Sequence, residues 1–303
     1  MYFTTLPDHS QPGFDEQAHF TKFKEHNIIF NALSTDKHCD DHVGCLSIKT
    51  VLCGEERYGT NNRHWTVRRG QFLILNDSQN YSCHIDRNVT ARTVSIFFKK
   101  DFATQVFHDV LQKEQDSLDN PFGNDGLPPE FFQTLIDIDP LLQSQLTSLM
   151  CTLDEVGFDQ DKTDECLIFI LLHLIQVHKS ESKKSMEVKA LRASTRMEVY
   201  KRLCIAKDLL HSNYMDKQDL QSIGRTAGLS VPQLVRQFKS VFKVTPHQYL
   251  MRIRLQRATE LLMNQTDRSI QAIAWKIGFE NPSAFGRAFK SMYGVVPGQY
   301  HRK

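Results

Sequence analysis

The spacing of hydrophobic and polar positions changes close to Lys99. Before it, short runs rich in β-branched and aromatic residues alternate with turn signals such as Arg69-Gly70. Regular spacing of this kind predicts an antiparallel β-barrel or sandwich. The strands are expected at residues 27–33, 45–53, 65–67, 71–75, 81–85 and 91–98. Beyond Lys99, apolar residues recur every three or four positions, which predicts helices.

Two amphipathic helices are expected after the strands. Asp139 and Pro140 give a helix start signal for residues 140–157, whose apolar face would hold Leu142, Leu146, Leu149, Leu153 and Val156. The second helix is expected at 163–178, with Ile168, Leu171, Leu172 and Ile175 on its apolar face. Together they predict an antiparallel hairpin. Residues 180–185 lack hydrophobic anchors, which marks a linker, and a further amphipathic helix is expected at 197–210.

Residues 219–249 and 269–300 are an internal repeat. Gln221, Ile223 and Gly228 match Gln271, Ile273 and Gly278 at an offset of 50 residues, and after one inserted residue Leu234, Arg236 and Phe238 match Phe285, Arg287 and Phe289 at an offset of 51. Each copy contains a helix, a break at its glycine and a second helix, which predicts a helix-turn-helix. Ser230 and Gln233 have capping-box spacing, and Asn281 precedes Pro282 at a first helical position.

The second helix of each copy has an apolar face and a basic face. The predicted buried faces are Leu234, Phe238, Val241 and Phe242 in the first copy, and Phe285, Phe289, Met292 and Tyr293 in the second. Arg236 with Lys239, and Arg287 with Lys290, then face outward. A solvated charged face would explain one such Arg–Lys pair. The recurrence of the pair in both copies favours DNA contact, because guanidinium groups bond guanine edges and lysine neutralises phosphate.

Charge is unevenly divided along the 303 residues, whose formal net charge is +2. Residues 196–303 hold 18 Lys and Arg against 7 Asp and Glu, which gives +11, and the other residues hold 19 against 28, which gives −9. A basic C-terminal third suits a polyanion such as DNA. The composition, 40% apolar and 24% charged, is that of a soluble globular protein.

The seven cysteines are odd in number and contain no CxxC pair, which argues against a disulfide framework or a zinc ribbon. Because Cys39, Cys45, Cys53 and Cys83 fall in the predicted β region, a redox sensor is an alternative, although buried inert thiols are favoured. No charged-then-apolar leader opens the chain, and the longest apolar run is far shorter than the ~20 residues that a bilayer requires. We expect a cytoplasmic protein without a membrane partner.

The paired motifs, the helix expected between them at 246–263, and the closing sequence GFENPSAFGRAFKSMYGVVPGQYHRK resemble the DNA-binding domain of the AraC/XylS family of bacterial transcription regulators. The resemblance implies that each second helix enters one of two successive major-groove faces. Pro232, Val235 and Ala284 stand where relatives often carry polar base readers, so we expect sparse hydrogen-bond readout with apolar contacts to thymine. The residues expected to contact DNA are Ser230, Gln233, Val235, Arg236, Lys239, Ser240, Asn281, Ser283, Arg287 and Lys290.

The segment VRRGQFLILNDSQNYSCHI resembles a stretch of cupin-like barrels, which in the same family bind small effectors. Candidates for an effector pocket are Tyr58, His64, Trp65, Tyr81, Cys83 and His84, of which strand alternation lets only about half point inward. For each of them, an ordinary core or surface role is the simpler interpretation. No HxH motif marks a metal site, and we expect neither metal nor cofactor. Residues 38–42 combine His, Cys and Asp, but neighbouring side chains point to different sides, so a solvated loop is expected there.

The resulting prediction is a multidomain α+β protein. Residues 1–179 form a cupin-like antiparallel β-barrel with a helical hairpin, residues 180–195 a linker, and residues 196–303 an all-α domain with two helix-turn-helix motifs joined by a linker helix. The predicted function is transcription regulation, activation by family resemblance, through double-stranded DNA and a small-molecule effector. The resemblance also implies a homodimer through helices 140–157 and 163–178 and, for an activator, contact with RNA polymerase. Two alternatives stay open: a cupin-type enzyme fused to a DNA-binding module, and a DNA-binding protein without an effector.

Overall fold

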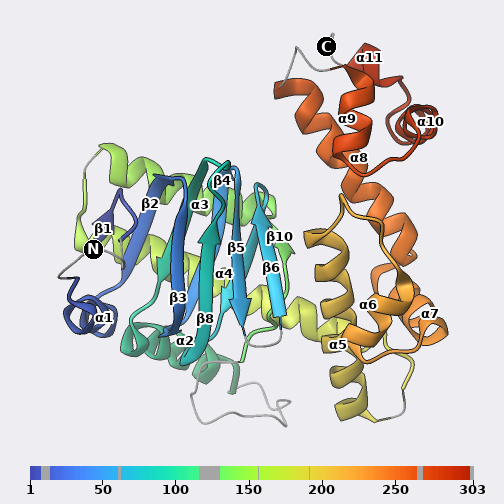
Figure 1. The fold of residues 1–303 in the computed structure, drawn as a ribbon. Coiled ribbons are helices and arrows are strands. Elements are labelled where there is room, and N and C mark those ends of the chain that lie inside the picture. The colour runs from blue at the N-terminus through green and yellow to red at the C-terminus, as the bar shows by residue number, and fades with distance from the viewer. Residues whose placement is uncertain are drawn as a thin grey trace. The chain divides into compact units, whose positions relative to one another are not determined.

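The computed structural model describes residues 1–7, 14–60, 63–115, 130–155, 157–190, 192–264 and 269–300. The chain divides into two compact units, Met1–Lys183 and Lys184–Lys303. The first contains β-sheets and helices and the second is helical, as the hydrophobic pattern predicts (Figure 1). No helix within the described ranges combines the length and the apolar character that crossing a membrane requires.

Two sheets form the centre of the first unit. In the described part of the chain, one has six strands in the order β1-β2-β9-β4-β7-β10, and the other has four in the order β3-β8-β5-β6. Neighbouring strands are antiparallel except β1 and β2, which are parallel. The strands are β1 (Tyr2–Phe3), β2 (Ile28–Ser34), β3 (Lys37–Gly44), β4 (Ser47–Cys53), β5 (Glu55–Thr60), β6 (Arg63–Arg68), β7 (Gln71–Leu75), β8 (Gln79–Ile85), β9 (Ala91–Phe97) and β10 (Ile136–Asp137).

The described strands do not close into the single barrel that the sequence predicts. β2 and β3 follow each other in the chain, but β2 pairs with β9 and β3 with β8, so these two strands belong to different sheets. The loop predicted at residues 38–42 is also wrong, since these residues belong to β3. A register shift between Cys39 and His42 interrupts this edge strand. Such a bulge disturbs the alternation on which strand prediction depends.

Alternating residues of the six-stranded sheet separate two hydrophobic cores, because successive strand side chains point to opposite faces. One face packs against the helices through a cluster that includes Ile29, Ile48, Ile74, Ile96, Leu146 and Leu171. The other packs against the four-stranded sheet through Val51, Tyr58, Trp65, Val67, Leu73, Leu75 and Tyr81. The first unit therefore has three layers, with the six-stranded sheet in the middle (Figure 1).

The predicted hairpin is present as α3 (Pro140–Glu155) and α4 (Gln160–Ser185), and the first unit also contains α1 (Glu16–Glu25) and α2 (Lys100–Gln115). Asp139 caps α3 by accepting a hydrogen bond from the backbone N–H of Leu142 at 2.9 Å. The four leucines predicted on the inner face of α3 are buried, and Val156 lies outside the described residues.

Two features of α4 correct the prediction. Ile168 is 37% exposed, whereas Leu167, Ile170, Leu171, Leu174 and Ile175 are buried. Because residues 167–172 are all apolar, two overlapping stripes fit the helical period equally well. The helix also continues to Ser185 through the residues expected to form a linker. Glu181 and Ser185 are buried, so this stretch is anchored by polar side chains that hydrophobicity does not reveal.

The second unit consists of the expected helices. Its first helix buries Val199, Tyr200 and Leu203 as predicted, and the helix between the two repeats begins at Pro246. The elements are α5 (Ala193–Ser212), α6 (Leu220–Ala227), α7 (Val231–Phe242), α8 (Pro246–Asn264), α9 (Ile270–Lys276), α10 (Pro282–Tyr293) and α11 (Pro297–Tyr300).

Candidate nucleic-acid interface and ligand pocket

Each copy of the repeat contains two helices joined by a turn, α6–α7 in the first copy and α9–α10 in the second, and each such pair is called a motif below. A glycine lies at each break, Gly228 with φ 66° and Gly278 with φ 83°. Side chains rarely tolerate this left-handed conformation, which explains the glycines. Asn281 caps α10 as predicted, because its Oδ1 accepts hydrogen bonds from the backbone N–H groups of Ser283 at 2.8 Å and Ala284 at 3.4 Å.

Ser230 does not cap α7 in the way that its spacing predicts. It occupies the N-cap position, but its side chain makes no capping hydrogen bond. A capping hydroxyl normally bonds the second or third backbone N–H of the helix. The second residue of α7 is Pro232, which has no N–H, so one of the two usual donors is missing.

The inner and outer faces of α7 and α10 largely follow the prediction. Leu234, Phe238, Phe285 and Phe289 are buried, whereas Arg236, Lys239, Arg287 and Lys290 are exposed. Met292 is a correction, because it is 41% exposed. Tyr293 instead extends the aromatic cluster, with its ring centroid 4.7 Å from that of Phe289 and 5.6 Å from that of Tyr300.

None of the four outward cations of the repeat, Arg236, Lys239, Arg287 and Lys290, has an ion-pair partner among the described residues. Other charged residues of this unit are paired, such as Arg202 with Glu198 at 2.8 Å. An exposed cation without a protein counter-charge can pair with a phosphate without first breaking a salt bridge. The two second helices thus present equivalent basic faces.

Further predicted contact residues lie around these cations. Gln233, Val235 and Ser240 are partly exposed on α7, and Ser283 is exposed at the start of α10. Ser240 is already engaged, since its hydroxyl donates to the backbone carbonyl of Glu187 at 2.9 Å. This hydrogen bond is part of a wider contact between α7 and the segment that precedes α5.

Residues 187–189 lie against α7. The carboxylate of Glu187 accepts from Lys243 Nζ at 2.9 Å. The buried amide side chain of Gln237 donates to the carbonyl of Lys189 at 3.2 Å and accepts from its N–H at 3.1 Å. The segment thereby places an acidic side chain at the C-terminal end of a basic helix.

Arg254 on α8 links the two motifs. Its guanidinium donates to the carbonyls of Tyr214 at 2.7 Å and Asp216 at 2.9 Å, which lie between α5 and α6. The same guanidinium lies 5.8 Å from the ring centroid of Phe279, at the turn of the second motif. Because Arg254 is buried, it fixes the spacing of the motifs from inside the unit.

The first unit contains a pocket of about 550 Å³ between the two sheets and α1. The six-stranded sheet contributes Phe30, Lys49, Ser95 and Phe97, the four-stranded sheet contributes Cys39, Glu56, Tyr58, Tyr81 and Cys83, and the N-terminal region contributes Leu6, Pro7, His19, Phe20 and Phe23. This volume lies in the range of sites for small molecules.

The effector candidates fall into three groups. Tyr58 and Tyr81 line the pocket and are buried. Trp65 is buried in the core between the sheets, and its ring lies 4.6 Å from the guanidinium carbon of Arg63. His64 is exposed on β6. Side-chain direction separates exposed His64 from the others. Tyr58 and Trp65 are cross-strand partners that both pack between the sheets, so their place along the sheet decides that Tyr58 lines the pocket and Trp65 does not.

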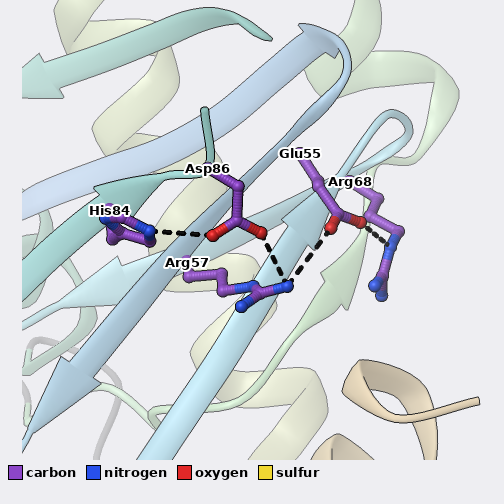
Figure 2. Close-up of polar contacts among 5 residues, drawn as sticks. All are labelled: Glu55, Arg57, Arg68, His84 and Asp86. Atoms are coloured by element: carbon purple, nitrogen blue, oxygen red, sulfur yellow. Dashed lines mark hydrogen bonds and ion pairs between the residues drawn. The ribbon is translucent and has the colours of Figure 1, made fainter. Parts of the chain in front are cut away.

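His84 also lines the pocket but belongs to a surface network of charges (Figure 2). Its Nε2 lies 2.8 Å from Asp86, whose other carboxylate oxygen is 2.8 Å from Arg57. Glu55 then connects Arg57 to Arg68, with its oxygens 3.9 Å and 2.7 Å from their nitrogens. The network orders the outer face of the four-stranded sheet and holds His84 at the pocket rim.

Sequence reasoning missed the two most buried charged groups of the pocket, Lys49 and Glu56, which are 2% and 3% exposed. Burial lowers the pKa of Lys49 to about 8, although nearby thiols and Glu56 oppose the shift. Burial raises the pKa of Glu56 to about 7, opposed by a hydrogen bond with Tyr58 and by the charge of Lys49. The strand pattern gives no sign of either, because each looks like an ordinary polar position.

Two thiols of the pocket, those of Cys45 and Cys83, are protonated at neutral pH. Burial raises the pKa of Cys45 to about 11. A hydrogen bond with Cys39, followed by burial, raises the pKa of Cys83 well above its ordinary value. A protonated thiol is a poor nucleophile, so these groups serve as pocket walls. Among the described residues, no group of three His, Cys, Asp or Glu side chains could hold a metal ion.

Comparison with known proteins is informative for the C-terminal part of the chain. Residues 223–303 match a family model described as "Helix-turn-helix domain". The chain is 38% identical over 88 residues to the HTH-type transcriptional regulator MtrA of Neisseria gonorrhoeae, and the aligned segment covers 29% of each chain. It is 34% identical over 89 residues to the HTH-type transcriptional regulator ArgR of Pseudomonas aeruginosa, covering 29% of this chain and 27% of that one. The chain thus matches less than a third of either relative.

Two solved structures show weaker similarity. A probable AraC family transcriptional regulator from Rhodopseudomonas palustris aligns with 33% of this chain and 94% of its own, at 24% identity and a TM-score of 0.32. Wild-type ToxT from Vibrio cholerae, solved with an unsaturated fatty acid bound, aligns with 91% of this chain and 93% of its own, at 15% identity and a TM-score of 0.35. At TM-scores of this size, neither structure indicates what this chain binds.

Proposed function

The C-terminal part of this chain is an AraC-type helix-turn-helix domain, and we propose that the whole chain is a sequence-specific transcription regulator that binds double-stranded DNA. In line with the family resemblance, it acts as an activator and contacts RNA polymerase in the cytoplasm. Its N-terminal unit responds to a small-molecule effector. The two relatives described above, MtrA and ArgR, are transcriptional regulators, which favours this role over that of an enzyme.

The observation that carries the proposal is the equivalent basic faces of α7 and α10. Arg236 and Arg287 occupy matching positions in the repeat, and each is followed three residues later by an exposed lysine. An arginine on the exposed face of a second helix reaches guanine edges, while the lysine neutralises phosphate. Two such helices on one chain read two successive major-groove faces.

The helix α8 supports this arrangement by its length. Its 19 residues extend roughly 28 Å at 1.5 Å per residue. That length approaches the ~34 Å between major-groove faces one turn apart. Because Arg254 ties α8 to the loop before α6, the two motifs engage DNA as one body with a fixed spacing.

The pocket of the first unit supports a sensing role. We propose that this unit is cupin-like in origin, with its strands arranged in two sheets, and that Tyr58 and Tyr81 contact the effector. An effector changes DNA occupancy only if it binds the two states of the protein unequally. A pocket of about 550 Å³ lined by buried charges can supply such a difference.

We propose that α3 and α4 form a homodimer interface. Leu141 is 58% exposed and Phe169 is 51% exposed. These residues belong to neighbouring parts of the hairpin, because Gln145 Nε2 donates to the carbonyl of Phe169 at 3.2 Å. Together with Ile168 they form an uncovered apolar face, and a second copy would bury it symmetrically.

Selection from a random pool of DNA duplexes by the full chain tests the proposal. We expect enrichment of a motif with two half-sites whose centres are about 10 base pairs apart, because adjacent turns of the major groove have that separation. Binding should weaken steeply with added salt. If no motif is enriched after repeated rounds, the chain does not recognise DNA sequence, and the proposed function is wrong.

A further inference from the structure

The ammonium group of Lys49 is buried and forms no ion pair with any residue in the part of the chain that the structure describes. Lys49 lies on β4 and lines the pocket. Among the described residues no carboxylate lies within 4 Å of it, and its close neighbours are rings, with Nζ 3.3 Å from the ring centroid of Phe97 and 5.3 Å from that of Tyr81. Burying a charge in this way is costly, and aromatic rings offset only part of the cost.

Glu56 does not serve as the missing counter-charge. Its carboxyl group accepts hydrogen bonds from Tyr58 and Cys83, which belong to its own sheet. Burial holds the pKa of Glu56 at about 7, while that of Lys49 is about 8. At neutral pH the carboxyl group of Glu56 is therefore only partly ionised, and it offsets only part of the charge of Lys49.

The walls around Lys49 are mainly apolar. The rings of Phe23 and Phe97 meet edge to face, with centroids 4.7 Å apart, and Phe30 lies 5.9 Å from Phe97. Leu6, Pro7 and Phe20 extend this wall towards the N-terminus. A polyphosphate would require several cations, whereas Lys49 is the one buried cation among the described residues that line this pocket.

We propose that the pocket binds a monocarboxylic acid with an apolar body, whose carboxylate pairs with Lys49 and whose body packs against Phe23, Phe30 and Phe97. This inference rests on the proposed sensing function and names the chemical class of its effector. A single ammonium matches a single carboxylate, because lysine acts as a point charge. The acid supplies an ion-pair partner for Lys49 that the described residues do not provide, and its body displaces water from the aromatic wall.

Two matched sets of probes test the proposal on the full chain: phenylacetate, phenethyl alcohol and phenethylamine, and octanoate, octanol and octylamine. Binding is measured by calorimetry and by the shift in thermal unfolding, without DNA. We expect the acid of at least one set to bind roughly 10-fold or more tightly than its alcohol, because a charge-assisted hydrogen bond contributes more than a neutral one. The amine should bind more weakly than either, since it meets Lys49.

Lys49→Met keeps the length of the side chain and removes its charge. We expect the affinity for the acid to fall ~10- to 100-fold while that for the alcohol is maintained. Met fits an apolar surrounding, so the variant should fold. Lys100→Met is the matched control: Lys100 is an exposed residue at the rim, 3.0 Å from Asp77, and its loss should change the affinity for the acid by less than about 3-fold.

Three results would overturn the proposal. They are an amine that binds as tightly as its acid, an acid preference that survives in Lys49→Met, and no binding of either acid to the wild-type chain. Failure of the proposed function is distinguishable from failure of this inference. If the chain binds the acids but selects no DNA sequence, the ligand class stands and the proposed role as a regulator is wrong. A chain that selects DNA and binds neither acid loses only the ligand.

Discussion

The two helix-turn-helix motifs have similar sequences but differ in what surrounds their turns. At the first turn, a Cβ added to Gly228 would lie 3.4 Å from the flexible side chain of Arg202. At the second, a Cβ on Gly278 would lie 2.4 Å from the backbone carbonyl oxygen of Met215 and 2.8 Å from Arg254. The second turn therefore packs directly on the loop before α6. Matching positions of a repeat can thus have unequal structural roles.

By contrast, the outward cations of α7 and α10 are equivalent. Arg236 and Arg287 are both exposed and unpaired within the described residues. The surroundings of the two turns differ, while the two basic faces are alike. This contrast indicates that the faces meet the same kind of partner, whereas the turns meet different neighbours within the protein.

The largest difference between the copies is expected for alanine at the turns. Gly228→Ala should lower the free energy of unfolding by about 1 to 2 kcal/mol, the cost of a left-handed alanine. Gly278→Ala adds a clash with rigid backbone and should cost roughly 2 to 5 kcal/mol in total. Urea unfolding followed by far-UV circular dichroism measures both. Equal midpoints for the two variants would show that the second turn is not tightly packed.

The outward arginines should have comparable effects on DNA binding. Arg236→Ala and Arg287→Ala are each expected to weaken binding to a selected site by about 1 to 3 kcal/mol, because each removes a proposed bidentate base contact. Titrations at fixed salt measure the loss. Arg87→Ala removes an exposed arginine of the first unit, which is paired with Asp36 at 3.1 Å, and is the control. If it weakens binding as much as the others, the loss reflects net charge alone.

A smaller effect is expected within the second helices themselves. Gly286 on α10 matches Val235 on α7, and a Cβ at Gly286 would meet no atom within 4 Å. Gly286→Ala should therefore stabilise the unit by about 1 kcal/mol through helix propensity. The increase in its urea midpoint tests this. An unchanged or lower midpoint would indicate that α10 gains nothing from a more rigid backbone.

The smallest effect concerns the acidic side chain at the end of α7. Glu187→Gln releases Lys243 from an exposed ion pair of 2.9 Å, which should change stability little. DNA affinity should increase slightly at low salt. The plot of the logarithm of the binding constant against the logarithm of the salt concentration should become steeper by about the amount that one phosphate contact contributes. Lys239→Ala should flatten that dependence by a similar amount. A salt slope unchanged by Glu187→Gln would place Lys243 away from the phosphates.

The repeat could be predicted almost residue by residue because its signals are local. A glycine at a break, an asparagine before a proline and an apolar stripe each act over a few residues. Ser230 departs from the prediction because Pro232 removes a backbone donor, and Met292 because α10 leaves it uncovered. Neither error affects the outward face.

The region of the pocket and some of its lining residues, such as Tyr58 and Tyr81, could be predicted from the sequence, but its buried charged groups could not. Lys49 and Glu56 lie within strands, where a polar residue normally points to water, and only the packing of one sheet on the other buries them. His64 and Trp65 illustrate the opposite error, because they flank the pocket region in sequence while one is exposed and the other lies in the core. Sheet pairing between distant strands decides these positions, and sequence spacing does not encode it.

Hydroxyl-radical footprinting of the full chain on a selected duplex tests the two-motif grip most directly. We predict two protected patches on one face of the DNA, about 10 base pairs apart, with one patch weakened in Arg236→Ala and the other in Arg287→Ala. A single patch that both variants weaken equally, or no protection at all, would contradict the account.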